Sequence, residues 1–81
     1  MGESVRMNRK FDTLQNTLGR NVRRLRRELN LSQEELAFQA EIDRTYVSQI
    51  ERGVINPSLL VLWKVANVLA VDVVALLKKA D

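Results

Sequence analysis

The segment from Asp43 to Gly53, DRTYVSQIERG, carries side chains that can bond nucleic acid when a helix holds them in place. Drawn at 100° per residue, it puts Tyr46, Val47 and Ile50 on one side with Asp43. The opposite arc has no carboxylate and consists of Arg44, Thr45, Ser48, Gln49 and Arg52. Guanidinium, amide and hydroxyl groups bond base edges and phosphates. The alternative is a surface helix whose polar side chains only face water.

A helix this short is marginal in water, so other elements must position it through Val47 and Ile50. The preceding helix begins at Ser32, which forms a capping box with Glu35. Its inner side is formed by Leu36, Ala37 and Ala40; Phe38 lies off this stripe, either under the first helix or on an exposed patch. Only Glu41 and Ile42 separate this helix from the cap at Asp43. Two short helices joined so tightly are typical of a helix-turn-helix.

The rest of the chain predicts further helices and no strand, so the fold class is all-α, with five helices in one compact domain. We expect residues 1–10 to be a flexible arm and residues 11–81 to be one domain. The first helix spans about residues 13–29, and its well-formed part begins near Thr17 because Gly19 costs roughly 1 kcal/mol relative to Ala. Its apolar stripe is Phe11, Leu14, Leu18, Val22, Leu25 and Leu29. Ser58 and Asp72 cap the last two helices.

The composition argues against an enzyme. The chain has 81 residues, no Cys and no His, which excludes disulfides, thiolate or imidazole metal sites and the usual nucleophile–base pairs. We expect no cofactor, no metal and no small-molecule ligand. The apolar run after Ser58 is interrupted by Lys64, Asn67 and Asp72, and the N-terminus lacks a signal-peptide core, so we expect a cytoplasmic protein without membrane partners.

The charge is concentrated near the N-terminus. The whole chain carries +3, whereas the part up to Arg27 has eight basic and two acidic residues. Most of these basic residues are Arg, which suits bidentate phosphate or base contacts better than Lys. This basic end predicts an anionic partner, against the alternative of a solvated helix face.

The segment LSQEELAFQAEIDRTYVSQIERGVINPSLLVLWKVANVLAV resembles the Xre/Cro family of phage-repressor-like DNA-binding domains, and the similarity extends over about residues 18–77. The resemblance implies that the third helix enters the major groove. It assigns base reading to Arg44, Thr45, Ser48 and Gln49. It assigns a phosphate contact to Gln33 and, as further candidates, to Tyr46, Arg52 and Asn56. The alternative for Tyr46 is a core aromatic residue. Arg26 and Glu51 match a pair that forms an internal salt bridge in some relatives.

The sequence departs from the common family pattern in three places. Glu41 and Ala70 stand where relatives often have Gly, and a left-handed conformation would cost a non-Gly residue about 1 kcal/mol. Val54 and Ile55 replace the Arg or Lys of many relatives, which puts backbone contacts from that loop in doubt.

Apolar residues in excess of the core predict a homodimer. In the fourth helix we expect the core to take Leu59, Leu62, Val65, Ala66 and Leu69, and in the fifth Val73 and Leu76. The surplus residues are Leu60, Trp63, Val74 and Leu77, which could form a two-fold interface. Alternatively, a tilted helix buries more of them within the monomer.

The expected function is therefore a sequence-specific double-stranded DNA-binding transcriptional regulator, acting as a homodimer on a pseudo-palindromic operator in the cytoplasm, associated with the nucleoid. The single-domain size, the DRTYVS motif and the aromatic residue of the fourth helix look like controller proteins of restriction–modification systems. An antitoxin or a phage repressor would share nearly all these residues. Two different functions would also be compatible with the fold: a protein-interaction module that has lost DNA binding, and a membrane-surface role for the basic helix.

Overall fold

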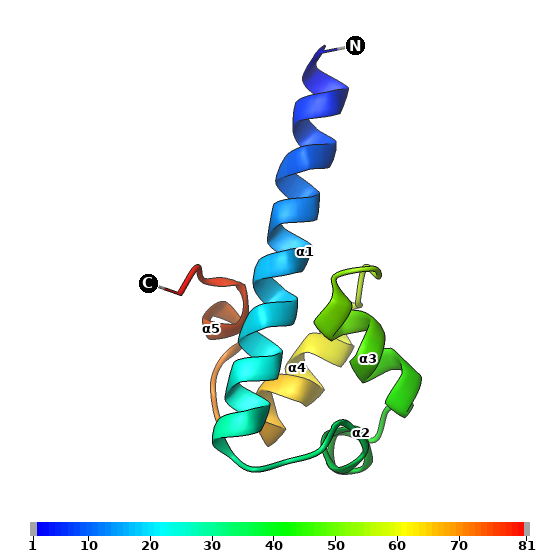
Figure 1. The fold of residues 1–81 in the computed structure, drawn as a ribbon, viewed down its shortest axis with the longest axis vertical. Coiled ribbons are helices and arrows are strands. Elements are labelled where there is room, and N and C mark those ends of the chain that lie inside the picture. Colours follow the sequence, from blue (N-terminus) through cyan, green and yellow to red (C-terminus); the bar gives the residue numbers. More distant parts are fainter. Residues whose placement is uncertain (1, 81) are drawn as a thin grey trace.

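The structure is a computed structural model that describes the backbone of residues 2–80 and the side chains of residues 10–80. Its five helices are α1 (Gly2–Glu28), α2 (Gln33–Ala40), α3 (Arg44–Arg52), α4 (Leu59–Val68) and α5 (Val73–Leu77). Helix α1 is the long axis of the molecule; its first turns stand clear of the other helices, and α3 and α5 pack on either side of its second half (Figure 1). The described residues contain no strand, which confirms the all-α class.

Helix α1 differs from the expectation at its start. It begins at Gly2 instead of near residue 13, so the backbone expected to form a loose arm is helical. Gly19 lies well inside this helix and is required there. A Cβ on Gly19 would lie 2.6 Å from the carbonyl oxygens of Ile50 and Glu51, so the missing side chain lets α1 approach the backbone of α3 closely.

Helices α1 to α4 end in the same way. In each, a residue just after the helix has a positive φ, and the next amide donates to the carbonyl five residues back, as Ile42 does to Ala37 at 3.0 Å. This is the Schellman motif, which usually uses Gly at the left-handed position. Here the left-handed residues are Asn30, Glu41, Gly53 and Ala70, with φ between 57° and 70°. Glu41 and Ala70 are therefore strained positions, as their place in the family pattern indicated.

The helix starts follow the predicted caps. The Ser32 hydroxyl accepts from the Glu35 amide at 3.0 Å, and the Glu35 carboxylate accepts from the Ser32 amide at 2.9 Å. Hydrogen bonding of the Glu35 carboxylate to Ser32, chiefly to its backbone amide, lowers the pKa of Glu35 below its ordinary value. Ser58 and Asp72 accept from the amides of Val61 and Ala75 at the starts of α4 and α5. Local capping thus fixes where α2, α4 and α5 begin.

The core lies between the second half of α1 and the other four helices. Its fully buried members include Val22, Leu36, Val47, Ile50 and Leu76. One buried polar side chain ties α5 to α1: the Asn21 amide nitrogen donates to the carbonyls of Leu76 and Lys78, both at 2.8 Å.

Several apolar residues are more exposed than their spacing predicts. Leu59 was expected in the core but is 74% exposed, so as the first residue of α4 it faces outward. Phe11, Leu14 and Leu29 are partly exposed, so only the middle of the α1 stripe is core. Phe38 is 84% exposed, so it lies on the surface and not under the first helix.

Candidate nucleic-acid interface

The polar arc of α3 lies on the surface of the domain. Val47 and Ile50 are buried on the opposite side of this helix and hold it against the core. Asp43 caps the helix by accepting from the Thr45 amide at 2.7 Å. Arg44, Thr45 and Arg52 are exposed, and Ser48 and Gln49 are partly exposed. The donors and acceptors predicted to read bases are thus presented together by one short helix, with its inner side fixed by packing.

The residues predicted to contact phosphate have different surroundings. Asn56 is exposed in the loop before α4. The Arg52 guanidinium is exposed and reaches back to the Ser48 carbonyl at 3.4 Å. Tyr46 is partly buried and packs against the core, which agrees with a core aromatic residue at the edge. Gln33 is partly buried as the first residue of α2.

A buried carboxylate, Glu51, joins the three helices around this surface. Its side chain is fully buried and accepts from Arg26 of α1 at 2.6 and 3.0 Å. It also accepts from Gln33 of α2 at 3.0 Å and from Arg23 of α1 at 3.3 Å. The remaining Arg26 donor group bonds the Leu31 carbonyl at 2.8 Å, just before α2. The salt bridge expected between Arg26 and Glu51 is therefore present and forms part of a larger network.

This network sets the ionisation of its members. Burial by itself raises the pKa of the Glu51 carboxyl, but the hydrogen bonds from Arg26, Gln33 and Arg23 outweigh it and leave the pKa below its ordinary value. The bond to Glu51 in turn raises the pKa of Arg26 above its already high value. Both groups are charged over the physiological range, so the carboxylate remains an acceptor for all three donors.

The sequence did not predict that Gln33 and Arg23 bond Glu51. Gln33 was expected to contact phosphate, and its bond to Glu51 was not foreseen. Arg23 was placed only in the basic cluster, although its Nε donates to Glu51. Their separation from Glu51, 18 and 28 residues along the chain, carries no local signal. The sequence analysis also missed Asn21. The available indication was its place on the buried side of α1, next to Leu18, Val22 and Leu25.

The outer surface of α3 can bond base edges but offers no acidic group for acid–base chemistry. Among residues 10–80 there is no cluster of three or more potential metal ligands. Within residues 2–80, no helix combines the length and apolar character needed to cross a membrane. A capped pair of short helices with a donor-rich outer face defines a helix-turn-helix DNA-binding domain.

The chain belongs to the helix-turn-helix family, whose model matches residues 22–76. Control protein C.BamHI of Bacillus amyloliquefaciens is 46% identical over 55 residues, which cover 67% of this chain and 68% of that protein. The crystal structure of the restriction-modification controller protein C.AhdI from Aeromonas hydrophila matches with a TM-score of 0.74 and 40% identity, covering 76% of this chain and 94% of that chain. The structure of SinR, master regulator for biofilm formation, in complex with DNA matches with a TM-score of 0.72 and 40% identity, covering 75% and 98%. The expected repressor-like family is therefore confirmed.

Proposed function

We propose that this protein is a transcriptional regulator that binds double-stranded DNA sequence-specifically as a homodimer, with α3 in the major groove. The observation that carries the proposal is the outer arc of α3, which presents Arg44, Thr45, Ser48 and Gln49 on a surface without carboxylates. Similarity to SinR, whose structure was solved in complex with DNA, supports the proposal that this chain also binds DNA. A cytoplasmic location in association with the nucleoid follows from this function, which includes no enzymatic step.

The chemistry of the four side chains matches the edges of the major groove. An exposed guanidinium such as that of Arg44 can donate two bonds to guanine O6 and N7, and the amide of Gln49 can pair with adenine N6 and N7. The Thr45 methyl can contact thymine. Each good bidentate pair discriminates against the wrong base by about 1–3 kcal/mol.

Phosphate contacts would fix the reading helix on the duplex. We assign them to Gln33, Arg52 and Asn56, and to the hydroxyl end of Tyr46. Gln33 is supported by its place at the start of α2, where the helix dipole favours an anion. Its bond to Glu51 uses one of the two amide hydrogens and leaves the other for a phosphate oxygen.

The proposed dimer uses the face formed by α4 and α5. Leu60, Trp63 and Val74 are 59%, 55% and 67% exposed, whereas Leu77 is partly buried against the core and has less to contribute. Beside Trp63 lies a surface hollow of about 580 Å³, which extends to Val73 at the start of α5. A bulky side chain next to a hollow on one face is what a two-fold interface needs, because each copy supplies both parts.

The controller proteins of restriction–modification systems are the best candidates for the particular role. The similarity to C.BamHI and to C.AhdI covers two thirds or more of this chain and of each of those proteins. A repressor role is the second candidate, because the immunity repressor protein of Bacillus phage phi105 is 40% identical over 60 residues. That repressor is matched over only 42% of its length, so its remaining part has no counterpart in the alignment.

The decisive experiment is selection of bound duplexes from a random DNA pool by the purified protein at near-physiological salt, followed by sequencing. We expect enrichment of a two-fold symmetric motif whose half-sites lie about one helical turn apart. Retention of DNA without enrichment would indicate phosphate-driven binding only. No retention would overturn the proposal and favour a protein-interaction module.

A further inference from the structure

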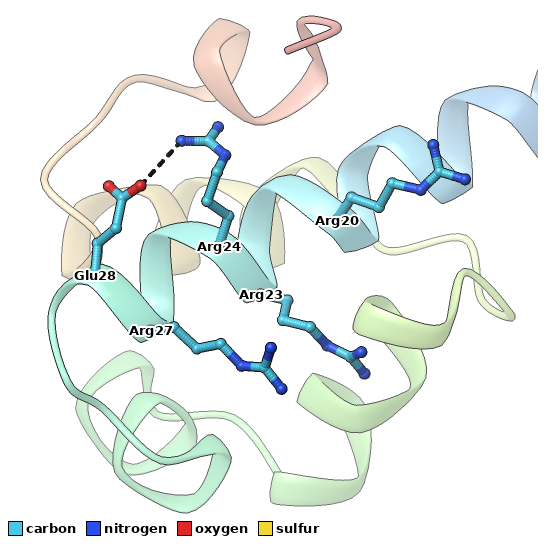
Figure 2. A pocket seen from close by; sticks show the side chains of 5 residues that line it. All are labelled: Arg20, Arg23, Arg24, Arg27 and Glu28. Atoms are coloured by element: carbon cyan, nitrogen blue, oxygen red, sulfur yellow. Dashed lines mark hydrogen bonds and ion pairs between the residues drawn. The ribbon is translucent and has the colours of Figure 1, made fainter. Parts of the chain in front are cut away.

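Four arginines and one glutamate line a surface hollow of about 480 Å³ on α1: Arg20, Arg23, Arg24, Arg27 and Glu28. Arg20, Arg23 and Arg27 follow one another at spacings of three and four, so they lie in one row along the helix. In Figure 2, Arg23 and Arg27 extend toward the same side of α1, whereas Arg24 and Glu28 extend toward the other. The hollow therefore has a basic edge and an edge whose charges compensate each other.

The partners of these side chains show which charges remain available. The Arg24 guanidinium is paired with the Glu28 carboxylate at 3.4 Å and donates to the Asn21 side-chain oxygen at 3.3 Å. The side chain of Arg23 is 45% exposed and shares only its Nε with Glu51. Within residues 10–80, Arg20 and Arg27 have no hydrogen-bond or ion-pair partner. The row thus presents two free guanidiniums and part of a third.

Folding does not explain this row. Like charges three or four residues apart on a helix are unfavourable by about 0.2–0.5 kcal/mol per pair, and the nearby carboxylate of Glu28 is already used by Arg24. Arg20 and Arg27 are exposed and bury no part of the core. A row of uncompensated guanidiniums at such a cost indicates an anionic ligand, and guanidinium suits phosphate in particular.

The row borders the surface that reads bases. Arg23 bonds Glu51, and on α3 at 100° per residue Glu51 lies 20° from Arg44 and 60° from Ser48. The charge of Glu51 itself is buried and satisfied, so it does not repel an anion at the surface. The basic row of α1 therefore meets the last turn of α3 at Glu51, on the same side of that helix as Arg44, about 10 Å further along its axis.

We propose that Arg20, Arg23 and Arg27 bind the phosphate backbone of the DNA strand that flanks the groove entered by α3. From Arg20 to Arg27 the helix advances about 10 Å at 1.5 Å per residue. Over the same length of the duplex axis one DNA strand carries about three phosphates, at 3.4 Å per charge along that axis. The contact is independent of base sequence, rests on the proposed function and extends the footprint of the domain from two helices to three.

The test compares two variants with the same net charge. Arg20→Gln with Arg27→Gln removes the two free guanidiniums, and the control, Arg24→Gln with Lys79→Gln, removes two charges outside the row. Binding of each variant to the selected duplex and to a random duplex is measured between 50 and 200 mM salt. We expect the slope of log K against log salt to become shallower by about 1.8 for the row variant, at about 0.9 per phosphate, and by clearly less for the control.

The row variant should bind both duplexes more weakly by the same factor. It should still select the same DNA motif, because phosphates carry no sequence information. Arg20→Lys with Arg27→Lys should restore most of the slope, since Lys also binds phosphate. Equal slopes for the row variant and the control would overturn the proposal while leaving sequence-specific binding intact. A shallower slope in the row variant without any enriched motif for the native protein would support the phosphate contact and overturn base reading instead.

Discussion

Glu51 shows how a buried residue can organise a surface. Its carboxylate accepts from Arg26, Gln33 and Arg23, which belong to two helices other than its own. Two of these donors, Gln33 and Arg23, also reach the surface on which we place phosphates. The ion pair thus orients side chains next to α3, although the Glu51 carboxylate itself is buried.

Replacing Glu51 by Gln should therefore be costly. The substitution leaves the buried guanidinium of Arg26 without its counter-charge, and loss of one partner of a buried pair costs about 3–5 kcal/mol. The measurement is urea unfolding followed by circular dichroism at pH 7. Glu28→Gln is the control, since it breaks an exposed pair with Arg24 and should cost no more than about 1 kcal/mol. Equal losses for the two variants would contradict a structural role for Glu51.

The native protein and the Glu51→Gln variant also give a pH test. The pKa of Glu51 is lowered in the folded state, so its contribution to stability is present above the unfolded pKa of about 4.3 and is lost as the pH falls through the folded pKa. The difference in unfolding free energy between the native protein and Glu51→Gln should be constant above about pH 5 and decrease below about pH 4. A difference that stays constant to pH 3 would show that the carboxylate is not stabilised by its donors.

Of the four proposed base-reading residues, Arg44 is the one for which we expect the largest effect. Arg44→Ala should remove preference for particular bases and weaken operator binding by about 1–3 kcal/mol, because a bidentate contact in the groove is lost. The helical circular dichroism signal should not change, since the side chain is exposed. Competition between selected and scrambled duplexes measures this. If binding to every duplex weakened equally, Arg44 would be a phosphate contact.

At the scale of elements, the packing of α1 on α3 depends on Gly19. In Gly19→Ala the new Cβ would meet two backbone carbonyls of α3 at 2.6 Å, and neither can rotate away. We expect a loss of about 1–3 kcal/mol, typical of overpacking, despite the higher helix propensity of Ala. Thermal unfolding measures it, with Arg20→Ala at the next, exposed position of the same helix as the control. A more stable Gly19→Ala protein would mean that the helices can separate freely.

The sequence predicted those elements that local chemistry determines. The caps at Ser32, Asp43, Ser58 and Asp72 are all present, and so is the tight turn between α2 and α3. Periodicity could not show that Gly19 is needed for close approach or that Leu59 faces outward, because both depend on where a neighbouring helix lies. The outer arc of α3 was readable from spacing alone, whereas the bonds of Gln33 and Arg23 to Glu51 required the tertiary fold.

At the scale of the whole molecule, the exposed face of α4 and α5 predicts self-association. Trp63→Ala should weaken the dimer by about 2 kcal/mol or more, because aromatic anchors dominate such interfaces. Sedimentation equilibrium measures the dissociation constant of the dimer. Phe38→Ala is the matched control: Phe38 is 84% exposed on α2, which does not belong to the proposed interface, and its loss should leave the dimer dissociation constant unchanged. Equal effects of the two substitutions would contradict the proposed interface.

The Asn21 amide, which fastens the end of α5 to the middle of α1, also sets an order of events during synthesis. On the ribosome α1 emerges first, but the carbonyls that Asn21 bonds are made more than 50 residues later. At about 5–20 residues per second, the 25 residues from Arg52 to Leu77 take about 1–5 s. For that time α3 has been synthesised, whereas the carbonyls of α5 that Asn21 bonds have not. The bonds of Asn21 therefore cannot form until α5 has been synthesised, well after α1, α2 and α3.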